Sequence, residues 1–430
     1  MSAAPQIKGW CPGALRPMQS GDGLLLRAKT LHPRLAADRA RAIAAIARDC
    51  GNGLVDLTQR AQLQLRGVTE AQLGEAQRRL AALGLLAKDE ATESLLNFLV
   101  SPLTRPAPSA FDVDALIAGL AETLSTDATL RALPGKFGFL IDDGGALGLA
   151  DREMDIRLER HGDDIAVLAD GARDRAFLVA PQRAVATALA LARAFLALRA
   201  GRERDLRRMR DVVASLGVDA LARAAGLAAT PCRSHCRSAS PSEIFGVHVE
   251  EAGRIFVGVG APSGRLHADD LRALADLAQT HGLRELRLSP WRALLLPCAT
   301  RAHAATIRDA AADLGLVVAA DDPRLSVIAC PGAPDCLQAL APTRDLASRL
   351  APLAARLARG GAALHISGCA KGCAAGAAAV TLVATSRGFD LVEDGRASDA
   401  PSRRGLCAHE IEGELQARID MRQEPQCPAH

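Results

Sequence analysis

Hydrophobic and polar positions follow the same order twice along the chain. In each copy a short apolar run, 23–29 or 254–260, precedes a segment with apolar residues at helical spacing that ends at Gly51 or Gly282. A run of alternating residues follows. Apolar residues three and four apart predict an amphipathic helix, and strict alternation predicts a strand with one buried face. Each copy therefore predicts a strand–helix–strand unit.

The two copies align with each other directly. Residues 34–65 match residues 265–296 without a gap at a constant offset of 231, and 12 of the 32 positions are identical. A shared abundance of Ala, Leu and Arg would also give two unrelated amphipathic helices some identities. The match continues past Gly51 and Gly282 into the next strand, which favours duplication. We expect a duplicated α+β architecture.

The alternating run 57–66 of the first copy predicts a single strand with a polar face. That face carries Thr58, Arg60, Gln62, Gln64 and Arg66. Two arginines on one face make a candidate floor for an anionic ligand, although an ordinary solvated face is the commoner source of polar alternation. The matching face of the second copy has Ser289, Trp291, Ala293, Leu295 and Pro297. We therefore expect only the first copy to keep a cationic surface.

Longer stretches of α/β character follow each unit. The first begins near 95–103. Helices are expected over 114–124, 184–199 and 344–359, and strands over 136–142, 325–329, 363–367 and 380–384. The basic segment 202–210 is expected to form a solvated helix between the halves. The predicted domains are two ferredoxin-like units, 1–75 and 235–312, and two α/β domains, 90–212 and 315–430.

Composition narrows the class of protein. The chain has 430 residues, too many for one compact core. Its 52 Lys and Arg against 49 Asp and Glu leave a net charge of only +3, and aromatic residues make up 3%. This balance argues against a nucleic-acid surface and a membrane anchor. The N-terminus has no secretory pattern, and Arg193 and Arg199 interrupt the longest apolar helical stretch. We expect a cytoplasmic protein.

The eleven cysteines are the main candidates for chemistry. Cys330 and Cys336 form a C-x5-C pair, and Cys369 and Cys373 form a C-x3-C pair, each directly after a predicted strand. Two loops at one sheet edge could bring four thiolates together, as a [4Fe–4S] cluster requires. Structural zinc, which prefers tighter pairs, and four inert buried cysteines are the alternatives.

A further C-x3-C motif lies between the halves. It contains Cys232, His235 and Cys236, with Arg233 and Arg237 beside the thiols. The arginines would lower the pKa of both thiols. A metal site here is a weaker hypothesis, because no second pair accompanies the motif.

The duplicated units and the order of the cysteine pairs resemble the nitrite/sulfite reductase superfamily over nearly the whole chain. The resemblance implies two ferredoxin-like half-domains paired by pseudo-two-fold symmetry, plus two α/β domains. It implies a [4Fe–4S] cluster on Cys330, Cys336, Cys369 and Cys373, with Cys373 matching the thiolate that also bridges to sirohaem iron in the reductases. Segments 58–66 and 133–137, the latter containing Lys136, match motifs that face the tetrapyrrole and its bound anion.

Two departures from the reductases point to another branch. Gly138 and Leu96 stand where reductases commonly place a second lysine and an arginine. Segments 9–14, 21–24 and 391–397 resemble the precorrin-3B synthases of aerobic cobalamin biosynthesis. That resemblance implies an oxygen-dependent monooxygenase that hydroxylates C20 of precorrin-3A and closes a γ-lactone. A sirohaem-dependent sulfite or nitrite reductase is the alternative, and a non-catalytic iron–sulfur or tetrapyrrole-binding protein is a third reading.

The resemblance also implies partners and site residues. A polycarboxylate substrate would use Arg60, Gln64, Arg66 and Lys136. The branch is associated with a mononuclear non-haem iron, but no pair of histidines has convincing ligand spacing; His365, beside the second cysteine loop, is the nearest candidate. No G-x-G-x-x-G motif opens a helix after a strand, so a separate NADH-linked protein is expected to deliver electrons. No catalytic residue is assigned.

Overall fold

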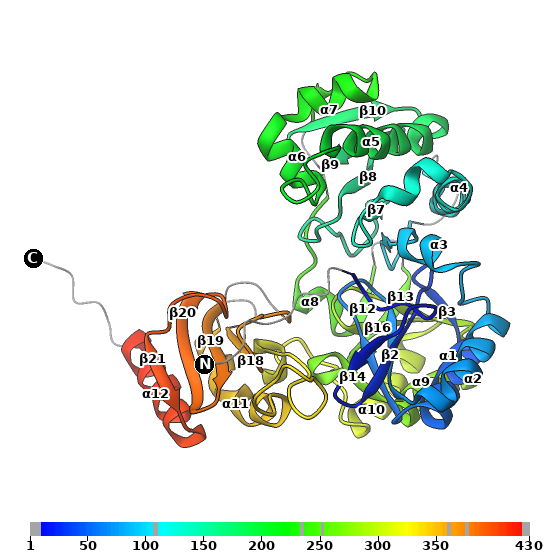
Figure 1. Ribbon diagram of the computed structural model, residues 1–430. Helices are drawn as coiled ribbons and strands as arrows, with labels where there is room; N and C mark the ends of the chain where they lie inside the picture. The colour runs from blue at the N-terminus through cyan, green and yellow to red at the C-terminus, as the bar shows by residue number, and fades with distance from the viewer. Residues whose placement is uncertain are drawn as a thin grey trace, which may run out of the picture.

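The computed structural model describes residues 10–105, 111–232, 236–250, 253–358, 363–374 and 378–423. These residues form four sheets, two of five strands in the half-domains, one of six strands and a last one of five. The half-domain pair lies at the corner of an L, and the two α/β domains form its arms (Figure 1). No helix in the described part of the chain is both long and apolar enough to cross a membrane.

The two half-domains are built alike, each around one sheet with two helices. The first contains β1 (Met18–Ser20), β2 (Gly23–Ala28), α1 (Ala37–Cys50), β4 (Leu54–Leu57), β5 (Leu63–Val68) and α2 (Glu70–Ala82). The second contains β12 (Gly246–Val249), β13 (Ile255–Gly260), α9 (Ala268–Thr280), β15 (Glu285–Leu288), β16 (Ala293–Cys298) and α10 (Arg301–Asp313).

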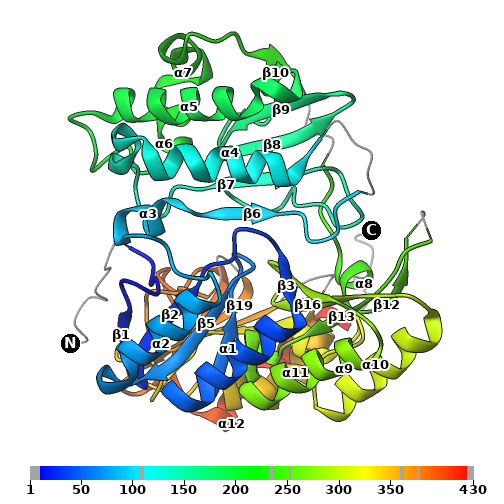
Figure 2. The same cartoon turned by 90° about the vertical axis from the view of Figure 1, so that its right-hand side faces the viewer.

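The half-domains complete each other by exchanging one short strand. β3 (Arg34–Ala36) joins the edge of β15 in the second sheet, while β14 (Arg265–His267) joins the edge of β4 in the first. Helices α1 and α9 pack side by side across the junction (Figure 2). One hydrophobic core runs through both units. This reciprocal exchange is the pseudo-two-fold pairing that the repeat predicts.

The duplication extends beyond the aligned segments. The offset of 231 relates α2 to α10, and it also relates α4 (Val113–Thr126) to α11 (Arg344–Leu357). The two α/β sheets share a plan, with three parallel strands followed by antiparallel ones. The chain is therefore two copies of a half-domain plus an α/β domain.

The first α/β sheet has the order β11-β10-β9-β8-β7-β6. Its members are β6 (Phe98–Val100), β7 (Phe139–Asp142), β8 (Ile156–His161), β9 (Asp164–Ala169), β10 (Arg175–Val179) and β11 (Thr230–Pro231), with helices α3 (Glu90–Leu95), α4, α5 (Ala184–Arg199), α6 (Met209–Leu216) and α7 (Val218–Ala225) around it. The short helix α8 (Pro241–Ile244) leads into the second half.

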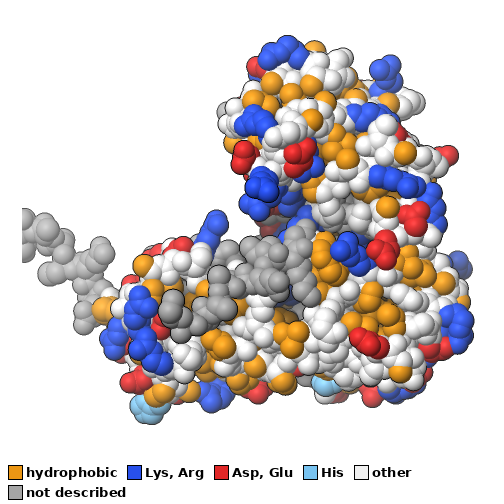
Figure 3. All heavy atoms as spheres, in the orientation of Figure 1, with side chains coloured by type: hydrophobic (Ala, Val, Ile, Leu, Met, Phe, Trp, Pro, Cys, Tyr) orange, Lys and Arg blue, Asp and Glu red, His pale blue; other side chains and the backbone are white. Residues whose placement is uncertain are grey.

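The second α/β sheet has the order β17-β18-β19-β20-β21. Its members are β17 (Val327–Ala329), β18 (Leu364–Ser367), β19 (Ala378–Thr385), β20 (Gly388–Gly395) and β21 (Arg403–Leu406), with α11 and α12 (Ala408–Gln423) packed against it. On the first α/β domain, which forms the other arm of the L, Lys and Arg side chains gather along the edge that faces the angle of the L (Figure 3).

Two of the secondary-structure predictions made from the sequence are wrong. The run 57–66 is not one strand but a hairpin, in which β4 ends at Leu57 and β5 begins at Leu63. Ala61 takes the left-handed conformation needed for this turn, with φ of 53°, and Arg292, offset by 231, does the same with φ of 58°. The basic segment 202–210 forms turns before α6 rather than a solvated helix.

Candidate functional site

The cysteine pairs lie at one edge of the last sheet. Cys330 directly follows β17, and Cys369 follows β18 after one glycine. The two strands are parallel neighbours, so their carboxyl ends meet, where ligand sites of such sheets form. The Gly368 N–H donates to Cys330 Sγ at 3.1 Å. The structure thus brings both loops together as the spacing predicts.

The four thiols affect each other electrostatically. Burial raises the pKa of Cys373 to about 11, and the charges of Cys330, Cys369 and Cys336 add to the rise. The pKa of Cys369 is raised in the same way. Bound iron would relieve this repulsion by stabilising the thiolates. Among the described residues no group of three or more His, Cys, Asp or Glu side chains is placed to hold a metal ion, so the cluster rests on the four thiol donors and their two neighbouring loops.

A separate group of cations surrounds Cys11; we call Arg27, Arg60, Lys136 and this thiol the cationic cluster. Arg27 comes from β2, Arg60 from the tip of the first hairpin, and Lys136 from the loop before β7. Burial alone would raise the pKa of Cys11, but the three cations hold it below its usual value. Arg60 donates to the Lys136 carbonyl at 3.2 Å, and Arg27 donates to Gln64 Oε1 at 3.3 Å.

Three of the four predicted substrate residues meet here: Arg60, Gln64 and Lys136. Among described residues, Arg27 Nε and Arg60 Nη1 are buried without a hydrogen-bond partner. Burial, with Arg27 nearby, lowers the pKa of Arg60. Buried unpaired donors are costly, and an anionic ligand would satisfy them. Arg27 was missed from sequence, although it pairs with Gln64 in the β2–β5 register and so shares its face.

A cavity of about 330 Å³ adjoins the cationic cluster. Its walls include Trp10, Cys11, Lys29 and Glu93. Lys29 Nζ donates to the Glu93 carbonyl at 2.5 Å and to Asn97 Oδ1 at 3.1 Å. Burial and the nearby Arg27 lower the pKa of Lys29 to about 8. Lys29, which the sequence patterns did not single out, can therefore hold or release a proton near neutral pH.

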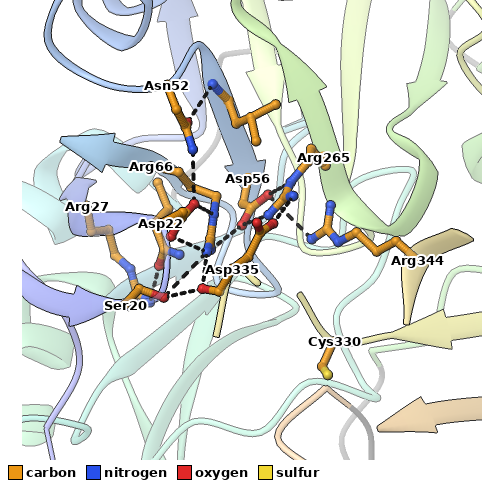
Figure 4. Close-up of polar contacts among 12 residues, drawn as sticks. Ser20, Asp22, Arg27, Asn52, Asp56, Arg66, Arg265, Cys330, Asp335 and Arg344 are labelled. Carbon is orange, nitrogen blue, oxygen red and sulfur yellow. Dashed lines mark hydrogen bonds and ion pairs between the residues drawn. The ribbon is translucent and has the colours of Figure 1, made fainter. Parts of the chain in front are cut away.

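The fourth predicted substrate residue, Arg66, lies elsewhere. It is 0% exposed and forms ion pairs with Asp22 and Asp56 at 2.8 and 3.0 Å (Figure 4). The predicted polar face placed it beside Arg60, but the hairpin turn separates the two. Arg66 faces the cysteine loop 330–336, because its Nη2 donates to the Asp335 carbonyl at 2.9 Å. It contributes to the protein interior rather than to an open ligand surface.

The second hairpin also carries a cation, contrary to expectation. Arg292 occupies its tip, and its charge is close enough to Cys373 and His365 to affect their surroundings. His365, on β18, is 0% exposed, and neither ring nitrogen has a hydrogen-bond partner among described residues. Alternation in sequence missed Arg292 because it places this residue on the face opposite to Ser289 and Trp291.

Protonation of His365 predicts a pH-dependent stability. Burial and Arg292 lower its pKa from 6.5 to about 4, so between these values only the unfolded chain takes up the proton. The free energy of unfolding should fall by about 2 kcal/mol from pH 7 to pH 5 through this group. Urea unfolding of His365→Leu should lack this part of the pH dependence. Exposed His409→Leu is the control, and an unchanged slope in His365→Leu would contradict the assignment.

The C-x3-C motif behaves differently from the prediction. Cys232 Sγ lies 3.7 Å from His161 Nδ1, while His235 and Arg233 lie outside the described residues. Burial, together with Glu159, raises the pKa of Cys232, and burial with Asp142 and Glu159 raises that of Cys236. The expectation that arginines lower these pKa values is wrong, because nearby carboxylates and burial outweigh them.

Comparisons with known proteins indicate the family to which this chain is related. A model of the nitrite/sulfite reductase ferredoxin-like half domain matches residues 16–83 and 248–314, the two half-domains. A precorrin-3B synthase of Sinorhizobium sp. is 30% identical over 417 residues, covering 93% of this chain and 86% of that protein. A ferredoxin–nitrite reductase of Synechococcus elongatus is 25% identical over 259 residues, 55% of this chain and 51% of that enzyme.

A solved structure shows the same fold. The Mycobacterium tuberculosis NirA protein superposes with a TM-score of 0.70, covering 94% of this chain and 82% of its own at 20% identity. On the similarity across nearly its full length, the chain belongs to the precorrin-3B synthase family of the nitrite/sulfite reductase superfamily.

Proposed function

We propose that the protein is an oxygen-dependent monooxygenase that converts precorrin-3A to precorrin-3B, hydroxylating C20 and closing a γ-lactone. The observation that carries the proposal is the cationic cluster with its unpaired donors on Arg27 and Arg60. A macrocycle with several carboxylates needs cations spread over separate segments, since each arginine fork binds a carboxylate directionally. The relative named precorrin-3B synthase supports the same substrate.

Each part of the site has a task in this proposal. Arg60 and Lys136 bind substrate carboxylates, and the Arg60 contact to the Lys136 carbonyl orients the two segments. Lys29, with a pKa of about 8, holds or releases a proton beside the substrate. A [4Fe–4S] cluster on Cys330, Cys336, Cys369 and Cys373 would supply single electrons from a separate NADH-linked donor.

We assign no ligands to a mononuclear iron. Among the described residues no three His, Cys, Asp or Glu side chains converge on a single-ion site. His365 has two unpaired nitrogens, but no second histidine accompanies it in such a group. No step of the proposal passes through this iron.

A sirohaem-dependent reductase is the second candidate, because nitrite reductases are among the relatives. The position of Gly138 weighs against it. A Cβ there would lie 2.4 Å from Met154 Cε and 2.8 Å from the Asn97 carbonyl oxygen. The second lysine of the reductases therefore has no room, and the dense positive charge that anion reduction needs is reduced.

Anaerobic purification followed by turnover tests the proposal. We expect no sirohaem absorbance, and we expect precorrin-3A with reductant and ¹⁸O₂ to give a product that gains one ¹⁸O atom. The same assay without dioxygen should give none. Bound sirohaem together with nitrite or sulfite reduction would support the second candidate. Failure to turn over precorrin-3A in a cluster-loaded protein would overturn the first.

A further inference from the structure

We propose that Arg66 and Asp335 are positioning residues that clamp the cysteine loop 330–336 onto the first half-domain. The inference rests on the proposed function, because the clamped loop would carry two of the four cluster thiolates. It assigns Arg66 a task different from substrate binding. Three arginines and three aspartates make up the clamp network: Asp22, Asp56, Arg66, Arg265, Asp335 and Arg344.

The backbone carbonyl of Asp335 is the central acceptor (Figure 4). Ser20 Oγ donates to it at 2.5 Å, Arg66 Nη2 at 2.9 Å, and the Gly21 N–H at 3.2 Å. The Asp335 carboxylate pairs with Arg265 of the second half-domain. One residue of the loop is thus bound by both half-domains, and the next residue in the chain is a cysteine of the proposed cluster.

Arg66 is itself held in one orientation. Its Nε and Nη2 both donate to Asp22 at 2.8 Å, and its Nη1 donates to Asp56 at 3.0 Å. Asp56 also accepts from Arg265 at 2.9 Å and lies 3.5 Å from Arg344, which begins α11. A guanidinium bound on both sides by carboxylates can aim its remaining N–H at one carbonyl.

The turn at Gly21 and the cysteine loop 330–336 have no free space between them. A Cβ on Gly21 would lie 1.9 Å from the Pro334 carbonyl oxygen. The turn between β1 and β2 therefore sits directly on the loop. This contact requires glycine, and it places the first half-domain against the cysteine loop without an intervening side chain.

The buried ion pairs of the network do not by themselves imply a gain in stability. Buried ion pairs lose much solvation energy, and apolar residues of similar volume are often as stable. What charges supply here is a fixed geometry among the segments around Ser20, Arg66, Arg265 and Asp335. Strand β5 carries Arg66 at one point and Gln64, beside the cationic cluster, two residues earlier. The same strand thus supports both the substrate side and the cluster side.

Hydrogen exchange and electron paramagnetic resonance of Arg66→Met test the clamp on the protein as purified. We expect amides of residues 333–340 to exchange at least tenfold faster, and the midpoint potential and resonance line shape of the cluster to change. Arg157→Met is the matched control, because Arg157 is also a buried arginine, 2.6 Å from Glu159, but lies in the first α/β sheet. The control should leave both measurements as in the wild type.

A milder variant covers the case in which Arg66→Met fails to fold. Ser20→Ala removes one donor to the Asp335 carbonyl and should speed exchange of the same amides by a smaller factor. Unchanged exchange in a folded Arg66→Met, or in Ser20→Ala if only that variant folds, would overturn the clamp. Absence of a cluster from the wild type would instead refute the proposed function, and the exchange measurement would still decide the clamp.

Discussion

Replacing Cys336 by serine is expected to abolish the brown visible absorbance of the purified protein and to lower its bound iron to near zero. The two cysteine loops follow neighbouring parallel strands, and each of the four thiolates would bind a different iron. A serine hydroxyl stays protonated at neutral pH and is a poor substitute for a thiolate. Iron and sulfide analysis, together with optical spectra, measures the effect.

Cys407→Ser is the matched control for this experiment. Cys407 is an exposed cysteine just before α12, outside both loops. It should keep the full absorbance. Equal iron content in Cys336→Ser and the wild type would remove Cys336 from the ligand set and would favour the reading of inert cysteines.

Substituting Arg60 by alanine is expected to weaken tetrapyrrole binding by about 10- to 100-fold, because a hydrogen bond to a charged group contributes about 1.5–3 kcal/mol. Arg60 has a buried Nη1 without a partner among the described residues, and its Nη2 orients the Lys136 segment. Titration with uroporphyrin III, a stable polycarboxylate macrocycle, followed by fluorescence quenching measures the affinity. The iron content should stay unchanged, because Arg60 lies outside the cysteine loops.

Two further variants make the Arg60 result specific. Arg60→Lys keeps the charge but loses the planar fork, so its affinity should lie between those of alanine and arginine. Exposed Arg183→Ala removes a surface cation next to α5 and should bind as the wild type does. Equal binding by Arg60→Ala and Arg183→Ala would remove Arg60 from the binding site.

The error over 57–66 has a specific physical cause. Alternation of apolar and polar residues continues through the hairpin turn, so a two-residue period alone cannot locate the reversal. The turn depends on a positive φ at Ala61, a conformation that alanine rarely adopts and that no composition signal marks. This error also affected the predicted site, because Arg60 belongs to the cationic cluster whereas Arg66 belongs to the clamp network.

The positions of the cysteines directly after predicted strands did locate the two cysteine loops. A cysteine placed directly after a strand has its position determined locally, and two parallel neighbouring strands bring their ends together. Arg27 and Cys11 could not be found in this way. Arg27 lies opposite Gln64 because β2 pairs with β5 in a particular register, which depends on tertiary packing. The Arg27 N–H donates to the Gly13 carbonyl at 3.3 Å, which holds the segment of Cys11 beside β2.

The sequence by itself determined the duplication, the helices and strands with clear periodicity, and the two cysteine pairs, because each of these depends on residues close together in the chain. Tertiary structure alone decided the exchange of β3 and β14, the burial of Arg66, and the meeting of Arg27, Arg60 and Lys136 around Cys11. The physical reason is that a charged side chain pairs with whichever oppositely charged or polar group the packed backbone brings within reach. The local sequence pattern shows only that a charged residue is present and does not identify its partner.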